Sequence, residues 1–412
     1  MGCGGPGRSA LPARTTSLAP ATTASGETVL YRFKGYSRRD GQEPLGGVTG
    51  LNGALYGTTA EGGDAKSCNQ ANKCGTVYRV SASGREEVLY SFKGAPDGQQ
   101  PLGNLLALNG LLYGTTGAGG EKNLGTVFAF DPATGAESVV YSFKGQDAGD
   151  GAYPSATLVA LDGVLYGTTN QGGVSGCTFY SHGCGVIFSL TALGTEHVIH
   201  VFNANKQNRE GAFPSGLTAT NGLLYGGTAI GGRYSESCPQ GCGILYAMKP
   251  SGRGFRSVHR FKGGNDGVGP ASLIYLNGRF YGNTSGGGGY SCDAVGDGCG
   301  TIFEVSASGG EHILHHFRGG YDGNGPNRLI AVGDTLYGTT IGGGSFSCTG
   351  YGCGTAFKIK TSGAGYAVLH NFLASPDGVA PTGPLLDQNG TLYGTTSSGG
   401  RKGLGTIFEL TP

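Results

Sequence analysis

Residues 109–116 read Asn-Gly-Leu-Leu-Tyr-Gly-Thr-Thr, and this stretch decides the fold because it recurs along the whole 412-residue chain. An Asn-Gly pair favours a two-residue type I′ hairpin turn, in which both central residues need a positive φ. The apolar and β-branched residues that follow favour a strand. The Tyr-Gly-x-Thr part occurs seven times, at Tyr56, Tyr113, Tyr166, Tyr225, Tyr281, Tyr337 and Tyr393.

Each repeat has the same internal order: a turn pair, the Tyr-Gly-x-Thr strand, a Gly-Gly pair, a loop, a Gly-Thr-Val-Phe-like strand, and a fourth apolar run that ends in Phe. No segment keeps a 3.6-residue apolar period, so the sequence predicts almost no helix. Four short strands repeated seven times predict an all-β fold, a seven-bladed β-propeller of four-stranded antiparallel blades. The turn pairs are Asn52-Gly53, Asn109-Gly110, Asp162-Gly163, Asn221-Gly222, Asn277-Gly278, Gly333-Asp334 and Asn389-Gly390.

The two ends of the repeat region complement each other. The region begins with a fourth-strand type (Val29 to Phe33) and ends with a third-strand type (Gly405 to Leu410). The last blade therefore lacks its outer strand, and we predict that the N-terminal strand fills this place and closes the ring. The predicted domains are a flexible polar leader over residues 1–27 and the propeller over residues 28–412.

The Leu-Tyr-Gly-Thr-Thr, Gly-Gly and Gly-Thr-Val-Phe series resembles the GloVer-type tandem repeat, found in bacterial surface or secreted proteins with varied anchors. The resemblance covers residues 28–412 and all seven units, with Gly227 and Asn283 in place of the third-position Thr. It implies a surface or secreted location and no catalytic residue. The strand order is also similar to that of kelch repeats, a similarity of fold alone.

Composition and charge exclude several classes of protein. The chain has 85 glycines, but they do not fall at every third position, which excludes collagen. The formal net charge is +1, so we expect no nucleic-acid partner, because nucleic-acid binding needs a basic surface. No run of about 18 apolar residues is present, and we expect no transmembrane helix.

Ten of the eleven cysteines form five local pairs, each between the second and third strands of a blade. Zinc is the alternative interpretation, but a zinc site needs four ligands at constrained spacing, and these pairs lie in different blades. Disulfides that staple five hairpin loops are favoured, and they predict an oxidising compartment, so that the protein is secreted, periplasmic or at the cell surface. The pairs are Cys68/Cys74, Cys177/Cys184, Cys238/Cys242, Cys292/Cys299 and Cys348/Cys353.

The eleventh cysteine, Cys3, follows Gly2 and precedes a stretch rich in Ala, Ser, Thr, Pro and Gly. Two interpretations remain open. Cys3 is either a free surface thiol or the lipid acceptor that remains at a Gly-Cys junction after a signal peptide is removed. The second interpretation predicts a lipid-anchored protein.

The long connections of every repeat are expected on one face of the ring, where functional residues usually lie. On this face each repeat carries an [Asp/Glu]-Gly-x-x-Pro motif. A ring of seven acids suggests a cation site, but Asp-Gly is also turn chemistry, and a role that recurs seven times favours a structural function. We therefore predict no metal. The acids are Asp40, Asp97, Asp150, Glu210, Asp266, Asp322 and Asp377.

The residue before the proline of this motif varies and predicts an off-centre pocket at the mouth of the ring. It is bulky in blades 1 to 4 and small in blades 5 to 7. In order these residues are Glu43, Gln100, Tyr153, Phe213, Gly269, Gly325 and Ala380. We take the four bulky residues as ligand-binding candidates.

Loop aromatics are further ligand-binding candidates, since flat rings with polar tips suit sugar faces. They are Tyr180, Tyr234, Tyr290 and Tyr351. The alternative is that these rings pack on their own disulfides.

The histidines mostly indicate structure. His200, His259, His315 and His370 align with Tyr31, Tyr90 and Tyr141 of the other repeats and so occupy one repeating slot. Only His182 is expected on the candidate face, where Asp150 or Glu210 would make it a base. The sequence contains no nucleophile elbow, His-Glu-x-x-His or phosphate loop in the right context, and it predicts no cofactor.

The sequence as a whole predicts a monomeric, non-catalytic, extracellular propeller that binds a glycan or a surface protein through the long-loop face. The alternative is an extracellular carbohydrate-active enzyme, a hydrolase or lyase, with acids at the central mouth. Two exposed carboxylates about 5–10 Å apart would favour the enzyme. An aromatic shelf without such a pair would favour binding.

Overall fold

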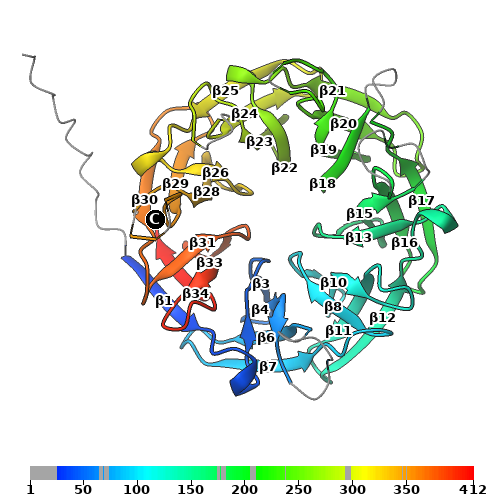
Figure 1. Ribbon diagram of the computed structural model, residues 1–412, viewed down its shortest axis with the longest axis vertical. Helices are drawn as coiled ribbons and strands as arrows, with labels where there is room; N and C mark the ends of the chain where they lie inside the picture. The colour runs from blue at the N-terminus through cyan, green and yellow to red at the C-terminus, as the bar shows by residue number, and fades with distance from the viewer. Residues whose placement is uncertain are drawn as a thin grey trace, which may run out of the picture.

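The structure is a computed structural model. Seven four-stranded antiparallel blades surround a central axis (Figure 1). The structure describes residues 26–64, 68, 74–173, 177, 182–204, 210–236, 238–292, 298–345, 347–348 and 350–412. Within these residues the only helical segments are four single 3-10 turns, which confirms the all-β prediction. They are η1 (Tyr36–Arg38), η2 (Gln146–Ala148), η3 (Gly264–Asp266) and η4 (Gly320–Asp322).

Every blade runs from an inner strand near the axis to an outer strand on the rim, and in four blades the inner strand is split in two. Blade 1 holds β3 (Thr49–Leu51), β4 (Ala54–Thr59), β6 (Thr76–Val80) and β7 (Glu86–Ser91), beside the short pair β2 (Gly41–Gln42) and β5 (Glu61–Gly62). Blade 2 holds β8 (Gly98–Pro101), β9 (Leu106–Leu108), β10 (Leu111–Gly119), β11 (Thr126–Asp131) and β12 (Ala136–Ser142). Blade 3 holds β13 (Gly151–Pro154), β14 (Val159–Leu161), β15 (Val164–Gly172), β16 (Val186–Leu190) and β17 (Glu196–Val201). Blade 4 holds β18 (Gly211–Thr220), β19 (Leu223–Gly231), β20 (Ile244–Met248) and β21 (Arg256–Arg260).

The remaining blades follow the same plan. Blade 5 holds β22 (Val268–Leu276), β23 (Arg279–Gly286), β24 (Thr301–Ser306) and β25 (Glu311–His316). Blade 6 holds β26 (Asn324–Pro326), β27 (Ile330–Val332), β28 (Thr335–Gly342), β29 (Thr355–Lys360) and β30 (Ala367–Asn371). Blade 7 holds β31 (Gly378–Pro381), β32 (Leu386–Gln388), β33 (Thr391–Gly399), β34 (Thr406–Thr411) and, as its outer strand, β1 (Gly26–Arg32).

The ring closes as the sequence predicts. Strand β1 pairs antiparallel with β34, from Gly26 opposite Thr411 to Arg32 opposite Thr406. Figure 1 shows the first strand of the chain against the last. This pairing removes the open sheet edge that β34 would otherwise present.

The two-residue turns explain the first part of the repeated stretch. In six of the seven turns both residues have positive φ, for example 52° at Asn109 and 82° at Gly110, as type I′ hairpins require. Blade 6 differs from the prediction: Gly333 has a φ of 61°, and Asp334 is not in the positive region. A glycine at the first central position suits the related type II′ turn, which explains the reversed residue order.

The core lies between the blades. The phenylalanine after each outer strand is 2% exposed or less, and its ring packs against an aromatic ring on the third strand of the next blade. Phe92 and Phe128 are typical, with ring centroids 5.0 Å apart. The glycine of Tyr-Gly-x-Thr makes room for this ring, since a Cβ on Gly114 would lie 2.5 Å from Cζ of Phe128. The other pairs are Phe33–Tyr78, Phe143–Phe188, Phe202–Tyr246, Phe261–Phe303, Phe317–Phe357 and Phe372–Phe408.

The residue at the third position of the motif also joins neighbouring blades. Thr115 Oγ1 donates to the carbonyl of Ala156 in the next blade at 3.4 Å, and Thr395 Oγ1 donates to that of Gly46 at 2.8 Å. Asn283, which replaces this Thr in blade 5, also bonds the next blade, through Nδ2 to the carbonyl of the motif proline Pro326 at 2.6 Å, two residues before the carbonyl that the threonines use. The departure from the repeat pattern therefore preserves its function.

Candidate functional site

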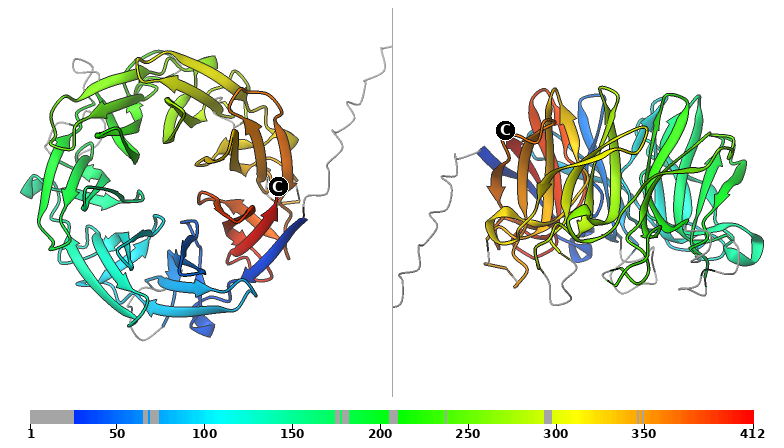
Figure 2. Two further views of the ribbon diagram at one scale, coloured as in Figure 1. Left: turned by 180° about the vertical axis from the view of Figure 1, so that it is seen from behind. Right: turned by 90° about the horizontal axis from the view of Figure 1, so that it is seen from above.

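The two faces of the ring differ in their connections. In the side view of Figure 2, tight hairpin turns line the upper face, and the connections that contain the 3-10 turns lie on the lower face. We call this lower face the long-loop face. The sequence places its candidates there, at the connections that enter the inner strands.

The residue before each motif proline has a fixed backbone in all seven repeats. The φ of Tyr153 is 57° and that of Phe213 is 55°, in the left-handed region that bulky residues rarely adopt. Their N–H groups donate to the carbonyls of Leu124 and Cys184 in the preceding blade, at 2.8 and 3.0 Å. The equivalent bond recurs at Glu43, Gln100, Gly269, Gly325 and Ala380. This inter-blade bond holds the backbone, so the side chain is free to vary.

Three of the four bulky side chains at this position face solvent. Glu43, Gln100 and Tyr153 are exposed, Tyr153 by 38%, and Phe213 is half-buried. They belong to blades 1 to 4, on one side of the ring, as Figure 1 shows for the inner strands β8, β13 and β18. The structure thus places these four candidates in equivalent positions of neighbouring blades.

In three blades the acid of the motif joins its own loop to the outer strand. In blade 2, Asp97 accepts hydrogen bonds from the Tyr90 hydroxyl at 2.9 Å and from the N–H groups of Lys93 and Gly98 at 2.9 and 2.6 Å. Asp40 and Asp150 repeat this pattern with Tyr31 and Tyr141. These bonds tie the loop to the outer strand, as expected from turn chemistry.

Histidine replaces tyrosine in this slot in the other four repeats, as the sequence predicts. The Nε2 atoms of His315 and His370 lie 3.2 Å from Asp322 and Asp377. The corresponding distances are 3.6 Å between His259 and Asp266 and 3.9 Å between His200 and Glu210.

At five of the seven boundaries between neighbouring blades, a second acid lies beside the motif acid, and the sequence analysis did not predict it. It is a glutamate near the start of the next outer strand: Glu27, Glu86, Glu137, Glu196 or Glu311. Burial first, and then the neighbouring aspartate, raises the pKa of Glu137 to about 7. At the other two boundaries an aromatic ring stacks on the histidine instead, Phe255 on His200 and Tyr366 on His315. Alignment of the outer-strand starts was the signal that could have revealed this position.

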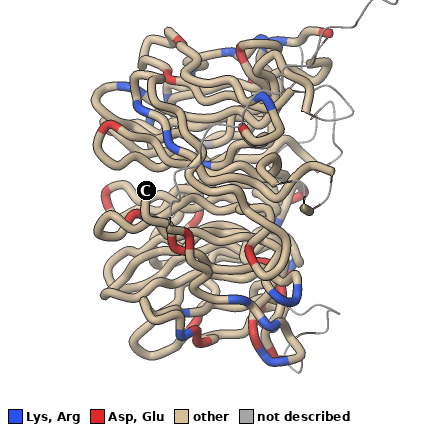
Figure 3. The backbone as a smooth tube through the Cα atoms, turned by 90° about the vertical axis from the view of Figure 1, so that its left-hand side faces the viewer, with Lys and Arg blue, Asp and Glu red and all other residues tan. Residues whose placement is uncertain are grey.

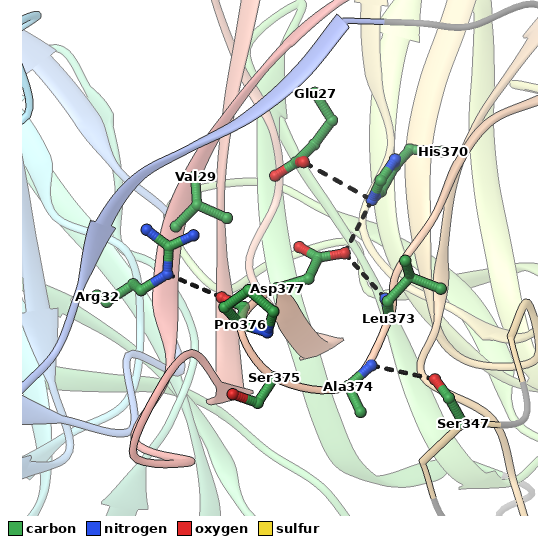
Figure 4. A pocket seen from close by; sticks show the side chains of 10 residues that line it. All are labelled: Glu27, Val29, Arg32, Ser347, His370, Leu373, Ala374, Ser375, Pro376 and Asp377. Atoms are coloured by element: carbon green, nitrogen blue, oxygen red, sulfur yellow. Dashed lines mark hydrogen bonds and ion pairs between the residues drawn. The ribbon is translucent and has the colours of Figure 1, made fainter.

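Figure 4 shows one such boundary as a groove of about 540 Å³. His370 points toward both Glu27 and Asp377, at 3.9 and 3.2 Å. Arg32 Nε donates to the carbonyl of Pro376 at 2.8 Å beside them. The groove lies on the rim between blades 6 and 7, away from the central mouth where the sequence placed the acids.

Two carboxylates of blade 1, those of Glu43 and Glu61, are close enough to influence each other electrostatically. Burial and the nearby Glu61 raise the pKa of Glu43. Gln42 Nε2 donates to Glu61 Oε2 at 2.7 Å and holds that carboxylate in place. A carboxyl with a raised pKa beside another carboxylate is the pattern used in general acid catalysis.

The aromatic candidates separate into exposed and anchored residues. Tyr290 and Tyr351 are 44% and 62% exposed, and the Arg318 guanidinium lies 5.6 Å from the centre of the Tyr290 ring. Tyr234 is half-buried, and its hydroxyl donates to the carbonyl of Ala204 at 3.0 Å. His182 is exposed, and its expected partner Asp150 is already bonded to Tyr141 and to backbone N–H groups. Tyr180 and Cys3 lie outside the described residues.

Arg328 is an interior residue that the sequence did not single out. It lies on the inner wall of blade 6, and its guanidinium donates to Oγ1 of Thr157 in blade 3 at 3.1 Å. The side chain therefore crosses the centre of the ring, and burial lowers its pKa. A cavity of about 530 Å³ lies along the inner strands of blades 2 to 5, against Leu106, Leu217 and Ile274.

The five predicted disulfides are all present, one in each of five blades. They indicate an oxidising, extracytoplasmic location. Basic and acidic residues are interspersed on the wall shown in Figure 3. No helix within the described part of the chain is long and apolar enough to cross a membrane.

All five pairs lie between the second and third strands of their blades, as the sequence predicts. In four of them the second cysteine is also completely buried, and the third strand of its blade begins two residues later. Cys74, for example, packs in one core cluster with Phe92 and Phe128. Its carbonyl accepts the N–H of Gln100 from the next blade at 2.9 Å, so the residue lies at the boundary between blades 1 and 2. These cysteines therefore belong to the core and are not available to a ligand. The four, each 0% exposed, are Cys74, Cys242, Cys299 and Cys353.

Comparison with solved structures shows the fold. An oligogalacturonate lyase from Vibrio parahaemolyticus is 12% identical with a TM-score of 0.54, over 90% of this chain and 89% of that one. A second oligogalacturonate lyase, in complex with manganese, is 11% identical with a TM-score of 0.54, over 95% and 94%. A puromycin hydrolase is 12% identical with a TM-score of 0.53, over 87% of this chain and 50% of that one. At these identities the similarity concerns the propeller alone.

Comparison with curated protein sequences finds no match. The model of the Gloeobacter/Verrucomicrobia repeat matches residues 16–238, 70–295 and 293–412. These ranges contain all seven Tyr-Gly-x-Thr motifs, each of which supplies the second strand of a blade. The chain therefore belongs to the Gloeobacter/Verrucomicrobia repeat family.

Proposed function

We propose that this chain is an extracellular binding propeller that recognises a glycan through its long-loop face. The observation that carries the proposal is the residue before the motif proline. Its backbone is held by the same inter-blade bond in every repeat, while its side chain is exposed in blades 1 to 3, half-buried in blade 4 and absent in blades 5 and 6, where the residue is glycine. Recognition surfaces commonly combine a rigid backbone with exposed side chains that vary.

The chemistry of these four residues suits a saccharide. Tyr153 and Phe213 offer rings for the apolar face of a sugar, and Glu43 and Gln100 offer groups that bond hydroxyls. The motif acids support binding over catalysis, because the structure already uses them between strand and loop. Tyr290 and Tyr351 extend the exposed aromatic surface.

Glycan-array binding of the wild type and of Tyr153→Gly tests this proposal. Glycine is the natural residue at this position in blades 5 and 6, so the substitution keeps the left-handed backbone without strain. We expect about tenfold weaker binding, the amount that one stacked ring contributes. Tyr321→Ala is the matched control, since it removes an exposed ring (62%) from a 3-10 turn rather than from the mouth.

An array without any bound glycan would contradict the glycan proposal. Capture of a surface protein that is lost in Tyr153→Gly would then assign the same face to a protein partner. Equal glycan binding by the wild type and Tyr153→Gly would move the site away from the mouth.

A carbohydrate-active enzyme is the second candidate, and the electrostatic interaction between Glu43 and Glu61 favours it. A carboxyl with a raised pKa acts as general acid while its neighbour stays ionised. Incubation with a panel of polysaccharides that includes oligogalacturonate would reveal product formation. Turnover that disappears in Glu43→Gln would support this function, and a wild type that releases no product would exclude it for that panel.

The localisation is also part of the proposal. Five disulfides are compatible with a secreted, periplasmic or surface protein, and Cys3 would provide a lipid anchor. Mass spectrometry of the chain expressed with a lipoprotein signal tests the anchor. We expect a diacylglyceryl mass on the wild type and its loss in Cys3→Ser. Size-exclusion chromatography with light scattering tests the expected monomer.

A further inference from the structure

One boundary cluster combines three potential metal ligands. His259 lies on β21 of blade 4, Asp266 ends η3 in the connection to blade 5, and Glu311 begins β25 of blade 5. Their side chains are 10%, 15% and 9% exposed. One nitrogen or oxygen atom from each lies within 4.8 Å of those from the other two.

Two polar atoms of this cluster are buried without a hydrogen-bond partner in the described part of the chain: Nε2 of His259 and Oε1 of Glu311. Nε2 lies 3.6 Å from Asp266 Oδ2 and 3.4 Å from Glu311 Oε2. A charge-assisted hydrogen bond would be about 2.7–2.9 Å. Atoms that surround one ion tetrahedrally at about 2.0–2.1 Å are about 3.3 Å apart. The observed spacing is closer to that of ligands around an ion.

The surroundings orient these ligands. Nδ1 of His259 faces the carbonyl oxygen of Gly309 at 3.4 Å, the kind of contact that fixes the tautomer of a metal-binding histidine. With the proton on Nδ1, the lone pair of Nε2 points toward two carboxylates. The backbone N–H of Lys262 donates to Asp266 Oδ2 at 2.6 Å and holds that carboxylate.

The other three blade boundaries that carry a histidine lack either the glutamate or the unpartnered ring nitrogen. Beside His315 and His200 an aromatic ring replaces the glutamate. In the cluster of Figure 4, His370 Nε2 is already bonded to Asp377 at 3.2 Å, and Glu27 is 3.9 Å away. Among the described residues, only the cluster at blades 4 and 5 joins three ligand side chains to an unpartnered ring nitrogen.

We propose that His259, Asp266 and Glu311 bind one divalent transition-metal ion, Zn²⁺ or Mn²⁺, between blades 4 and 5. An imidazole with two carboxylates suits these ions. Two carboxylates and a neutral imidazole carry a charge of −2, which the ion neutralises. Three protein ligands leave a coordination position for water. The ion links two outer strands, so its binding stabilises the folded ring by mass action.

Calorimetric titration with ZnCl₂, and separately with MnCl₂, tests the proposal on the oxidised, chelator-treated full chain. The Cys3→Ser background removes the thiol of Cys3 as a competing ligand. We expect one bound equivalent and a metal-dependent rise in melting temperature. His259→Gln and Glu311→Gln should each weaken binding at least about tenfold. His315→Gln, in the equivalent slot beside Tyr366, and Glu27→Gln, in the cluster of Figure 4, should leave binding unchanged.

Three results would overturn the site: no binding of either ion, equal binding by the wild type and both ligand variants, or a loss of binding in Glu27→Gln instead. The melting temperature of each variant in chelator shows whether the fold is intact. If His259→Gln proves unfolded, Glu311→Gln gives the decisive comparison.

Discussion

The Tyr90 hydroxyl donates a hydrogen bond to Asp97 at 2.9 Å, within blade 1 and its connection to blade 2. Glu137, from the outer strand of blade 2, lies against this pair, and the two acids and Lys93 influence one another electrostatically. Equivalent groups recur at the next boundaries. The rim of the ring is thus held by repeated polar contacts outside the aromatic contacts of the core.

Tyr90→Phe should lower the free energy of unfolding by about 1–3 kcal/mol, since the partly buried Asp97 carboxylate loses its hydroxyl donor and keeps only the two backbone N–H donors. Tyr90→His should cost less, because histidine occupies this slot in four other repeats. Chemical denaturation of both variants checks the difference. Equal stability of Tyr90→Phe and the wild type would show that the bond contributes nothing.

Stability should fall as the pH rises from about 4.5 to 7. Burial raises the pKa of Glu86, Glu137 and Glu196 from 4.5 to about 7, so in this window the folded chain binds more protons than the unfolded chain. The free energy of unfolding therefore decreases as the pH rises. The stabilisation by these protonated glutamates is fully present only below the pKa that glutamate has in the unfolded chain. The groups that face Glu137 are Asp97, Tyr90 and Lys93.

Denaturation between pH 4 and 8 checks this dependence. Glu137→Gln mimics the protonated form, so it should be more stable relative to the wild type at pH 8 than at pH 4. Glu87→Gln is a control on the neighbouring strand β7, where that side chain is exposed and pairs with Arg79. The same pH slope in the wild type and Glu137→Gln would contradict the assignment.

Gly114→Ala should destabilise the chain by about 1–3 kcal/mol, because its Cβ would lie 2.5 Å from the buried Phe128 ring. The φ of Gly114 is not positive, so the effect isolates packing from backbone strain. Gly350→Ala is the control, since a Cβ there meets nothing within 4 Å. Thermal melts of the two variants should differ clearly, and equal melting temperatures would contradict the packing argument.

The fold could be predicted because its determinants are local. Pairs such as Asn109-Gly110 specify a turn through their own φ angles, and sevenfold recurrence leaves few architectures. The cysteine pairs could be assigned for the same reason, since each closes a loop within one blade. The histidine slot followed from the alignment of one repeat with another.

The contacts between blades could not be predicted in this way. Tyr90 and Glu137 lie on different blades, and strand order alone does not show which end of one outer strand faces the next. The proximity of His259, Asp266 and Glu311 likewise arises from the packing of two neighbouring blades. The burial of Cys74 does as well, because this residue lies at the boundary with the next blade. Only the closed ring brings such groups together.

Removal of residues 28–35 should lower the melting temperature sharply and promote association of chains. The deletion takes away most of β1, which pairs with β34, and with it Phe33, whose ring packs on Tyr78 at 5.3 Å. Strand β34 then becomes an unpaired edge, which other chains can extend. Calorimetry measures the first effect and light scattering the second. Addition of a synthetic peptide with the sequence of residues 26–35 should partly restore the melt, because it can reoccupy the edge. An unchanged melt of the deletion variant would show that blade 7 is stable with three strands and that closure by β1 does not hold the ring.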